Sequence, residues 1–281
     1  MTRIHPSAVV DPQAELGKQV EIGPFCVIEA GAVVGDQCQL AGRVTVKSGT
    51  ILGADNEIAE GTTLGGRAQH LVASAGGSLV IGRGNRIREN VTIHRGFQPG
   101  GETRIGDNNL IMVNSHIAHD CKVSNHCVLV NNVMLAGHVE VHDRAYFGGG
   151  AAVHQFCRVG RFAMVGGYAR VTKDIPPYVL VDGEGTEIVG LNKVGLKRNG
   201  FTSQDIAQLK SAYRVIYRRG LRWNEVLAAL EAEYSAGPAA LLLEFFQGGK
   251  RGFVPERRIS RKATLKLVKF QEGDDEVREA A

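Results

Sequence analysis

Apolar side chains recur at every sixth position through the first 171 residues. The repeat runs unbroken from Ile4 to Leu64, slips by one residue before Ile81, misses at Pro99 and ends at Val171. Glycine often follows the apolar residue, and this hexapeptide pattern predicts a β-helix. Each six-residue unit forms one flat side, and three sides form an 18-residue rung that buries its apolar residues against the next rung. The repeat positions are Ile4, Val10, Leu16, Ile22, Ile28, Val34, Leu40, Val46, Leu52, Ile58, Leu64, Ile81, Ile87, Ile93, Ile105, Ile111, Ile117, Val123, Leu129, Leu135, Val141, Phe147, Val153, Val159, Val165 and Val171.

Two stretches interrupt the repeat and predict loops. Residues 65–80 break the register by one residue, and residues 94–104 keep the phase but contain Pro99 and Gly100, which cannot form a regular side. Loops that leave a solenoid tend to lie on one face and to carry function. We therefore expect residues 1–189 to form one mostly β domain with two functional loops.

Helical periodicity replaces the repeat toward the C-terminus. Thr202, followed three residues later by Asp205, is typical of a helix N-cap. Beyond it, five apolar residues fall on one helical face, namely Ile206, Leu209, Tyr213, Ile216 and Tyr217. The predicted segments are helices over residues 223–234 and 238–246, a helical C-terminal domain over residues 190–250, and a charged, frayed tail over residues 251–281.

The five cysteines all stand four residues after a repeat position, where other units hold small residues such as alanine or valine. We therefore expect Cys26, Cys38, Cys121, Cys127 and Cys157 to be reduced residues packed inside the coil. Their odd number and the lack of a paired spacing argue against a disulfide framework or a zinc ribbon. No apolar stretch approaches the ~20 residues of a membrane span, and the N-terminus has no signal-peptide hydrophobic region. A cytoplasmic protein is expected.

Charge is distributed unevenly along the chain. Residues from 190 onward carry 17 Lys and Arg against 11 Asp and Glu, whereas the preceding residues carry 16 against 18. A basic helical region beside a near-neutral solenoid favours an acidic partner, the alternative being a merely solvated helical surface. Nucleic acid is not expected, because no binding motif or aromatic stacking pattern accompanies the charge.

Three sides of the repeat that lie 18 residues apart concentrate histidines. Because they start at Ile117, Leu135 and Val153, they stack on one face of successive rungs, about 4.8 Å apart. Together they carry His119, Asp120, Gly137, His138, His154 and Gln155, with His116 at the preceding corner.

This histidine face predicts proton-transfer chemistry. Histidine is the side chain best matched to proton transfer near neutral pH, and Asp120 or a backbone carbonyl could fix the tautomer of His119. No serine or cysteine on the face is an obvious nucleophile, since Cys121 and Cys157 occupy inward positions. The pattern therefore favours direct transfer assisted by a general base over a covalent enzyme intermediate.

Five sequence motifs lie in the histidine-bearing sides and at the start of the helical region. They are Asn90-Val91-Thr92-Ile93-His94-Arg95-Gly96, His116-Ile117-Ala118-His119-Asp120-Cys121, Leu135-Ala136-Gly137-His138-Val139, Val153-His154-Gln155-Phe156, and Gly195-Leu196-Lys197-Arg198 with Gly200-Phe201. In these motifs the chain resembles the UDP-N-acetylglucosamine acyltransferases that open lipid A synthesis. The resemblance covers the chain from Ile4 to about Phe246 and implies a homotrimer of left-handed parallel β-helices with helical C-terminal caps and active sites between subunits.

The resemblance also implies roles for individual residues. His119 would take the proton from the sugar 3-hydroxyl, Asp120 would orient His119, and the Gly137 N–H would stabilise the oxyanion. The acyl donor would be a 3-hydroxyacyl group on the phosphopantetheine of acyl carrier protein, whose acidity suits the basic C-terminal region, and no resident cofactor or metal is expected. The other implied positions are His116, His138, His154 and Gln155 for the substrate, Asn192 and Arg198 for the nucleotide, and Gly167 for measuring acyl length.

The chain departs from the family pattern at its first loop and near the nucleotide. Gln69-His70-Leu71-Val72 stands where the family usually has Gln-Asp-Leu-Lys, which makes His70 a candidate substrate residue. Val194 replaces a glutamate and Asn199 replaces a second arginine. These departures leave three alternatives for the function. The chain binds the usual substrate in a different way, it acts on a different UDP-amino sugar with a 3-amino acceptor, or it is a weakened or non-catalytic relative that binds the carrier protein. The sequence does not determine the acyl length either.

A metal-dependent hydratase is a further alternative, because carbonic anhydrases also exist on trimeric β-helices with interfacial histidines. Zinc would need three converging ligands and an open position. The spacing of His116 and His119 differs from the one expected for that group, which disfavours this alternative.

Overall fold

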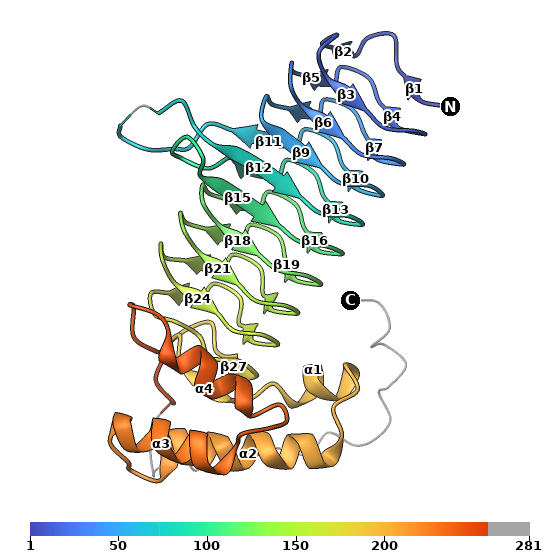
Figure 1. Ribbon diagram of the computed structural model, residues 1–281. Helices are drawn as coiled ribbons and strands as arrows, with labels where there is room; N and C mark the ends of the chain where they lie inside the picture. The colour runs from blue at the N-terminus through green and yellow to red at the C-terminus, as the bar shows by residue number, and fades with distance from the viewer. Residues whose placement is uncertain (73, 258–281) are drawn as a thin grey trace.

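Figure 1 shows the computed structural model as a long coil of short strands with helices gathered at its C-terminal end. The structure describes residues 1–72 and 74–257. The coil has three flat sides, each a sheet whose strands run parallel and come from successive rungs, except that the last strand of one sheet, residues 188–191, pairs antiparallel with its neighbour. The fold is the left-handed parallel β-helix that the repeat and the resemblance predicted.

Three sheets form the sides of this prism, and we number them by size. The first sheet contains β1 (Arg3–Ile4), β4 (Glu21–Ile22), β7 (Gln39–Leu40), β10 (Glu57–Ile58), β13 (Arg86–Ile87), β16 (Leu110–Ile111), β19 (Val128–Leu129), β22 (Tyr146–Phe147), β25 (Met164–Val165), β27 (Val179–Val181) and β28 (Ile188–Leu191). The second contains β2 (Val9–Val10), β5 (Val27–Ile28), β8 (Thr45–Val46), β11 (Thr63–Gly66), β14 (Thr92–His94), β17 (His116–Ile117), β20 (Met134–Leu135), β23 (Ala152–Val153) and β26 (Arg170–Val171). The third contains β3 (Glu15–Leu16), β6 (Val33–Val34), β9 (Thr50–Leu52), β12 (Ser78–Ile81), β15 (Glu102–Ile105), β18 (Lys122–Val123), β21 (Glu140–Val141) and β24 (Arg158–Val159).

The six-residue repeat sets both the register and the core. Strand partners lie one rung apart, as in Ile4 with Ile22 and Ile117 with Leu135. From Ile22 onward the repeat residues are almost completely buried. All five cysteines are free and buried beside them, as the sequence predicted. The interior is therefore a continuous apolar column that runs the length of the prism.

The one-residue slip in the sequence is absorbed at β11. The pairing of β11 with β14 shifts between Leu64 and Gly66, after which the chain leaves the coil and returns at β12. Gly65 has φ +82°, a backbone conformation that favours glycine. The coil then continues in register, with Ile81 beside Leu52.

Buried asparagines tie the corners of successive rungs together in the middle of the coil. The Nδ2 and backbone N–H groups of Asn85 both donate to Asn56 Oδ1, and those of Asn109 both donate to Asn85 Oδ1. Cys127 N–H donates to Asn109 Oδ1 and completes the series. Because each amide satisfies its neighbour, these polar groups are buried without losing hydrogen bonds.

Each rung turns sharply at its corners. Within residues 1–72 and 74–257, eighteen residues other than glycine have a positive φ, and nearly all of them stand at corners of the coil. They include Asp120, His138 and Phe156, which occupy equivalent places on three successive rungs along the edge between the second and third sheets.

The helices close the C-terminal end around a second apolar cluster. They are α1 (Lys193–Arg198), α2 (Ser203–Arg218), α3 (Trp223–Glu233) and α4 (Ala240–Gln247). Thr202 caps α2, since Asp205 N–H donates to Thr202 Oγ1 at 3.1 Å and Thr202 N–H donates to the Asp205 carboxylate at 2.8 Å. The short helix α1 and the strands β27 and β28 had no counterpart in the sequence prediction, because none of them follows a clear periodicity. No helix in the described part of the chain is long and apolar enough to cross a membrane.

The segment after α4 runs back along the β-helix. Asp174 N–H donates to the Gly252 carbonyl at 2.8 Å, Val254 N–H donates to the Asp174 carbonyl at 3.0 Å, and Ile188 N–H donates to the Pro255 carbonyl at 2.8 Å. Residues 251–257 therefore form ladder-like bonds, although the sequence analysis placed them in the frayed tail. The rest of that tail, residues 258–281, lies outside the described residues.

Candidate active site

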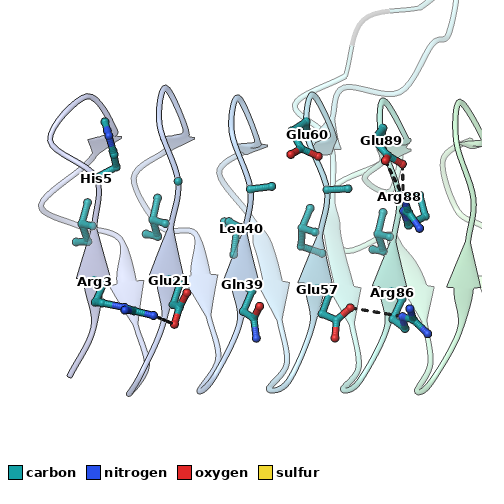
Figure 2. Close-up of a pocket in the computed structure, with 17 residues that line it drawn as sticks. Arg3, His5, Glu21, Gln39, Leu40, Glu57, Glu60, Arg86, Arg88 and Glu89 are labelled. Carbon is teal, nitrogen blue, oxygen red and sulfur yellow. Dashed lines mark hydrogen bonds and ion pairs between the residues drawn. The ribbon is translucent and has the colours of Figure 1, made fainter.

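A groove of about 590 Å³ crosses the outer face of the first sheet over the N-terminal rungs (Figure 2). Ion pairs line it, including Arg3 with Glu21 and Arg86 with Glu57. It contains none of the site residues that the sequence predicted. The histidines lie elsewhere, on the edge between the second and third sheets.

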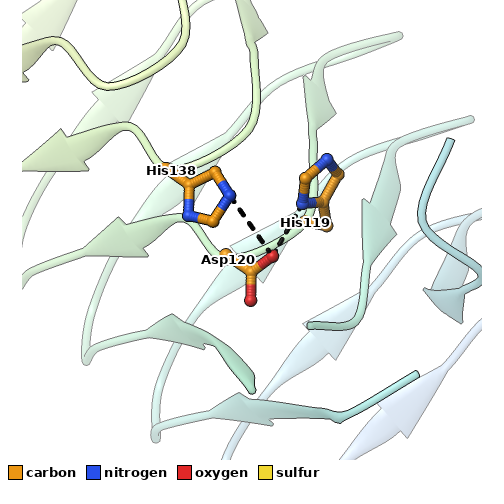
Figure 3. A group of neighbouring side chains, drawn as sticks. All are labelled: His119, Asp120 and His138. Carbon is orange, nitrogen blue, oxygen red and sulfur yellow. Dashed lines mark hydrogen bonds and ion pairs between the residues drawn. The ribbon is translucent and has the colours of Figure 1, made fainter. Parts of the chain in front are cut away.

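A histidine–aspartate pair stands on that edge between β17 and β18 (Figure 3). His119 Nδ1 lies 2.7 Å from Asp120 Oδ2, and the two side chains are only 12% and 15% exposed. A carboxylate can only accept, so Nδ1 carries the proton and His119 Nε2 keeps its lone pair. Such a pair is arranged to accept a proton at Nε2.

The loop over residues 94–104 holds the aspartate in place. Phe97 N–H donates to Asp120 Oδ2 at 3.1 Å, and Asp120 N–H donates to the hydroxyl of buried Thr103 at 2.8 Å. One carboxylate oxygen thus accepts from both the loop and His119. The second predicted loop therefore determines the orientation of the histidine ring.

Gly137 allows the His119 ring to stand directly against the backbone of the next rung. A Cβ at position 137 would lie 2.8 Å from His119 Cε1 and 2.9 Å from Nε2, distances that no ordinary contact reaches. Among the described residues, Gly137 N–H has no hydrogen-bond acceptor. A free backbone donor therefore lies beside the basic nitrogen of His119.

His138 forms the second wall of the site. Its Nε2 lies 3.7 Å from Asp120 Oδ2, and its ring stacks on Phe156 with centroids 4.6 Å apart and planes 10° apart. Burial lowers the pKa of His138, with Asp120 opposing and His119 adding to the shift. Burial therefore favours the neutral form of His138, which can both donate and accept a hydrogen bond.

His119, Asp120 and His138 also offer three ligand atoms within 4.8 Å of one another, which is the geometry of a group that could hold a metal ion. The hydrogen bond between His119 and Asp120 accounts for their spacing without an ion. His116, the other ligand considered in the sequence analysis, is bonded instead to Thr92, with 2.8 Å between Nδ1 and Oγ1.

A second pair of histidines extends the site along the second sheet. The rings of His94 and His116 meet edge to face with centroids 4.8 Å apart. Burial lowers the pKa of His94 to about 4 and also lowers the pKa of His116. The sequence analysis did not name His94 as a site residue, although it lies inside a quoted motif. It stands at the start of the predicted loop over residues 94–104 and outside the three stacked sides.

The loop over residues 65–80 brings His70 to the same edge. The rings of His70 and Phe97 stack with centroids 4.0 Å apart, and the His70 and His119 centroids are 6.0 Å apart. His70 Nδ1 accepts from Val72 N–H at 3.1 Å, so its proton lies on Nε2. The residue that departs from the family pattern therefore lies beside the histidine–aspartate pair.

The residues predicted to bind the nucleotide and to measure the acyl chain lie on the other two edges of the prism. Asn192 caps α1, accepting from Gly195 N–H at 3.0 Å and donating to the Phe162 carbonyl at 3.0 Å, which anchors α1 to the edge between the third and first sheets. Arg198 is exposed at the end of this helix. Gly167 lies between β25 and β26, on the edge between the first and second sheets. A single chain thus does not bring Asn192, Arg198 or Gly167 to His119.

The cysteines nearest the site are unsuited to nucleophilic attack. Burial raises the pKa of Cys121 to about 12, and its thiol donates to the Ala136 carbonyl at 3.0 Å. Burial also raises the pKa of Cys157. Both residues belong to the core, as the sequence predicted.

A coil built from hexapeptide repeats is typical of one class of bacterial transferase. Residues 102–137, which include the His119–Asp120 pair, match the family model described as "Bacterial transferase hexapeptide (six repeats)". The fold and the site therefore define a hexapeptide-repeat transferase.

Closer comparisons name a particular family. Residues 174–254 match the model described as "Udp N-acetylglucosamine O-acyltransferase; Domain 2". The acyl-[acyl-carrier-protein]–UDP-N-acetylglucosamine O-acyltransferase of Halorhodospira halophila is 48% identical over 257 residues, which is 90% of this chain and all of that protein. Its counterpart in Janthinobacterium is 48% identical over 261 residues with the same coverage. The chain belongs to this family and is an acyltransferase.

Solved structures agree with this assignment. The UDP-N-acetylglucosamine acyltransferase of Francisella novicida aligns with a TM-score of 0.84 and 36% identity over 90% of this chain and 94% of that one. The Acinetobacter baumannii structure gives 0.85 and 36% over 89% and 99%. The Arabidopsis enzyme gives 0.78 and 38% over 89% and 99%.

Proposed function

We propose that this chain transfers a 3-hydroxyacyl group from acyl carrier protein to the 3-hydroxyl of UDP-N-acetylglucosamine, as the first step of lipid A assembly in the cytoplasm. The observation that carries the proposal is the His119–Asp120 pair, whose free Nε2 stands beside the unpaired N–H of Gly137. Relatives 48% identical along their full length carry the same activity in their names.

In the proposed reaction His119 Nε2 takes the proton of the sugar hydroxyl as its oxygen attacks the thioester carbonyl carbon. The resulting imidazolium is stabilised by Asp120 at Nδ1, and Gly137 N–H donates to the developing oxyanion. As the tetrahedral intermediate collapses, the carbon–sulfur bond breaks and the imidazolium returns its proton to the departing thiolate. The products are the acylated sugar nucleotide and the free thiol of the carrier, so no resident cofactor is needed.

The remaining residues of the edge would bind the acceptor. His116, His138, His154 and Gln155 present imidazole and amide groups to the sugar, and His70 extends this wall from the first loop. His70 and Val72 stand where the family has charged residues, so the sugar would be held by aromatic surface and neutral hydrogen bonds in place of ion pairs. A hydroxyl acceptor fits this neutral surface better than an ammonium group does.

We further propose that three copies of the chain assemble and that each active site lies between two of them. This proposal is supported by the fact that the predicted site residues lie on three different edges of one chain. His119 lies on one edge, α1 with Asn192 and Arg198 lies on a second, and Gly167 lies on the third. Packing prisms side by side brings the edge of one against a different edge of its neighbour. The partner's α1 would then supply the nucleotide-binding arginine, and Gly167 would limit the acyl chain.

The carrier protein is the proposed macromolecular partner. The chain from residue 190 onward has an excess of lysine and arginine, which suits an acidic protein. The phosphopantetheine arm would deliver the thioester to the edge where His119 stands.

Turnover by purified protein tests the proposal directly. Mass spectrometry should detect acylated UDP-N-acetylglucosamine when 3-hydroxyacyl carrier proteins of several lengths are supplied, with the 3-amino sugar compared in parallel. His119→Ala should lose at least ~10³-fold in kcat, whereas His126→Ala, at a corner on another edge, should not. Full turnover by His119→Ala would overturn the general-base role.

Mixed trimers test the shared site. His119→Ala subunits and Arg198→Ala subunits are each expected to be inactive alone. After they are unfolded and refolded together, some sites should combine an intact His119 edge with an intact partner α1. If mixing restores no activity, His119 and Arg198 act in the site of the same subunit, and the shared-site proposal is wrong.

A further inference from the structure

Arg251 reaches from the C-terminal segment to the histidine edge. Its Nη2 lies 3.2 Å from His154 Nδ1, a contact between residues 97 positions apart in the sequence. The sequence analysis assigned Arg251 to a frayed tail and gave it no role. The contact therefore links a segment outside the repeat to a proposed substrate residue.

A second acceptor and the docked backbone around it position the Arg251 guanidinium. Nη2 also donates to the Thr172 carbonyl at 3.3 Å, while Nε is buried without a hydrogen-bond partner among the described residues. The nearby Arg251 guanidinium partly opposes the burial that raises the pKa of Cys157. Next to it, Gly252 and Val254 form the backbone bonds to Asp174 that fix this stretch against the coil.

His154 Nδ1 has two neighbours that demand opposite protonation states. The Gln155 carbonyl oxygen lies 3.2 Å away and can only accept, whereas the Arg251 guanidinium, also 3.2 Å away, can only donate. A protonated Nδ1 would bond to Gln155 and place an N–H against a positive donor. An unprotonated Nδ1 accepts from Arg251 and gains a charge-assisted hydrogen bond.

We propose that Arg251 is a positioning residue that fixes His154 in the tautomer with its proton on Nε2. The guanidinium is permanently charged, so its charge-assisted bond to Nδ1 outweighs the neutral hydrogen bond that a protonated Nδ1 would make to the Gln155 carbonyl. His154 then presents Nε2–H as a donor at the edge of the site.

This tautomer matters for the acceptor if the proposed function holds. A donor at Nε2 can bond to an oxygen of the sugar or its diphosphate, whereas the other tautomer would offer a lone pair and repel it. Arg251 would thus act on the substrate only through His154 and without touching it.

Imidazole nitrogen shifts measure the tautomer without any substrate. In protein labelled with ¹⁵N-histidine, the His154 signals, assigned by their loss in His154→Gln, should show a protonated Nε2 and an unprotonated Nδ1. Arg251→Met should move the proton to Nδ1 in most molecules, and Arg251→Lys should retain the original pattern. A protonated Nδ1 in the unmodified protein would overturn the proposal, even if Arg251→Met failed to fold.

Arg257→Met is the matched control for loosening the segment. Arg257 belongs to the same stretch but pairs with Asp182 and Glu187, away from His154. It should leave the His154 tautomer unchanged. If Arg257→Met shifted the tautomer as Arg251→Met does, the effect would come from segment docking and the specific role of Arg251 would be lost.

Kinetics separate this inference from the proposed function. Arg251→Met should raise KM for the sugar nucleotide about tenfold with a smaller change in kcat, and Arg251→Lys should recover most of it. A tautomer change without a kinetic change would confirm the positioning role and refute the assignment of His154 to the substrate. An unchanged tautomer with a raised KM would overturn the positioning role itself.

Discussion

Arg158 binds the fully buried carboxylate of Asp174 and, from the same guanidinium, the C-terminal end of α4. Its Nε lies 2.8 Å from Asp174 Oδ2, and its Nη2 donates to the carbonyls of Phe245 and Gly248 at 3.0 and 2.8 Å. The guanidinium also lies over the Phe245 ring, 4.3 Å from its centroid. One side chain therefore joins the last rung of the coil to the helical cap.

Arg158→Met should destabilise the protein by about 3 kcal/mol or more, because it leaves the Asp174 carboxylate buried without its partner. Urea unfolding followed by circular dichroism measures the loss. Arg3→Met, which breaks an exposed pair with Glu21, should cost less than about 1 kcal/mol. Equal losses for the two variants would show that the buried pair has no special weight.

Gly137→Ala should lower kcat by at least about 100-fold while the fold stays intact. The new methyl group must push the His119 ring away from the backbone that carries the oxyanion donor. Steady-state kinetics with circular dichroism measure both effects. Gly42→Ala is the control, since a Cβ there meets nothing closer than 3.4 Å; wild-type kcat in Gly137→Ala would contradict the proposed role.

Stability should fall as the pH is lowered, in part through His94. Its pKa is about 4 in the folded protein and 6.5 for the free side chain, because burial disfavours the imidazolium form. Between these values the unfolded chain binds a proton that the folded chain rejects, so this contribution is complete above pH 6.5 and is lost toward pH 4.

His94→Gln removes that proton uptake. Relative to the variant, the unmodified protein should lose about 1.4 kcal/mol per pH unit within the window. Urea unfolding at about pH 7.5 and about pH 5, at one fixed protein concentration, measures the difference. Parallel pH profiles for the two proteins would mean that His94 does not titrate in this way.

His70→Ala should raise KM for the sugar nucleotide about tenfold and change kcat less. The variant removes the ring stacked on Phe97 but leaves the Phe97 N–H bond to Asp120, so binding should suffer more than proton transfer. Initial rates at varied sugar nucleotide give both constants. Leu71→Ala, at a fully exposed position of the same loop, serves as the control, and an unchanged KM in His70→Ala would remove His70 from the site.

The sequence predicted the coil and much of the site because both depend on one short-range period. The six-residue repeat predicted that Cys121 lies inside the coil, and the 18-residue rung predicted that His119 and His138 lie on one edge. Neither inference required knowledge of contacts between distant segments.

The six-residue period could not predict the contacts made by segments outside the coil. The stack of His70 on Phe97 joins two loops that leave the coil, and the contact of Arg251 with His154 joins the C-terminal segment to a corner. The position of Asn192 on another edge follows from where α1 docks. Such long-range pairings depend on tertiary packing, which a local pattern does not encode.

The corner residues along the edge between the second and third sheets favour activity at a cost in stability. On N-terminal rungs, the left-handed corner position of this edge is held by glycine, at Gly31 and Gly49, where the conformation costs little. On the three rungs of the site, the same position holds Asp120, His138 and Phe156, each at a cost of about 1 kcal/mol or more in backbone strain. An engineer who stabilised this edge by consensus would choose glycine at all three and would remove the carboxylate, the imidazole and the ring on which it stacks.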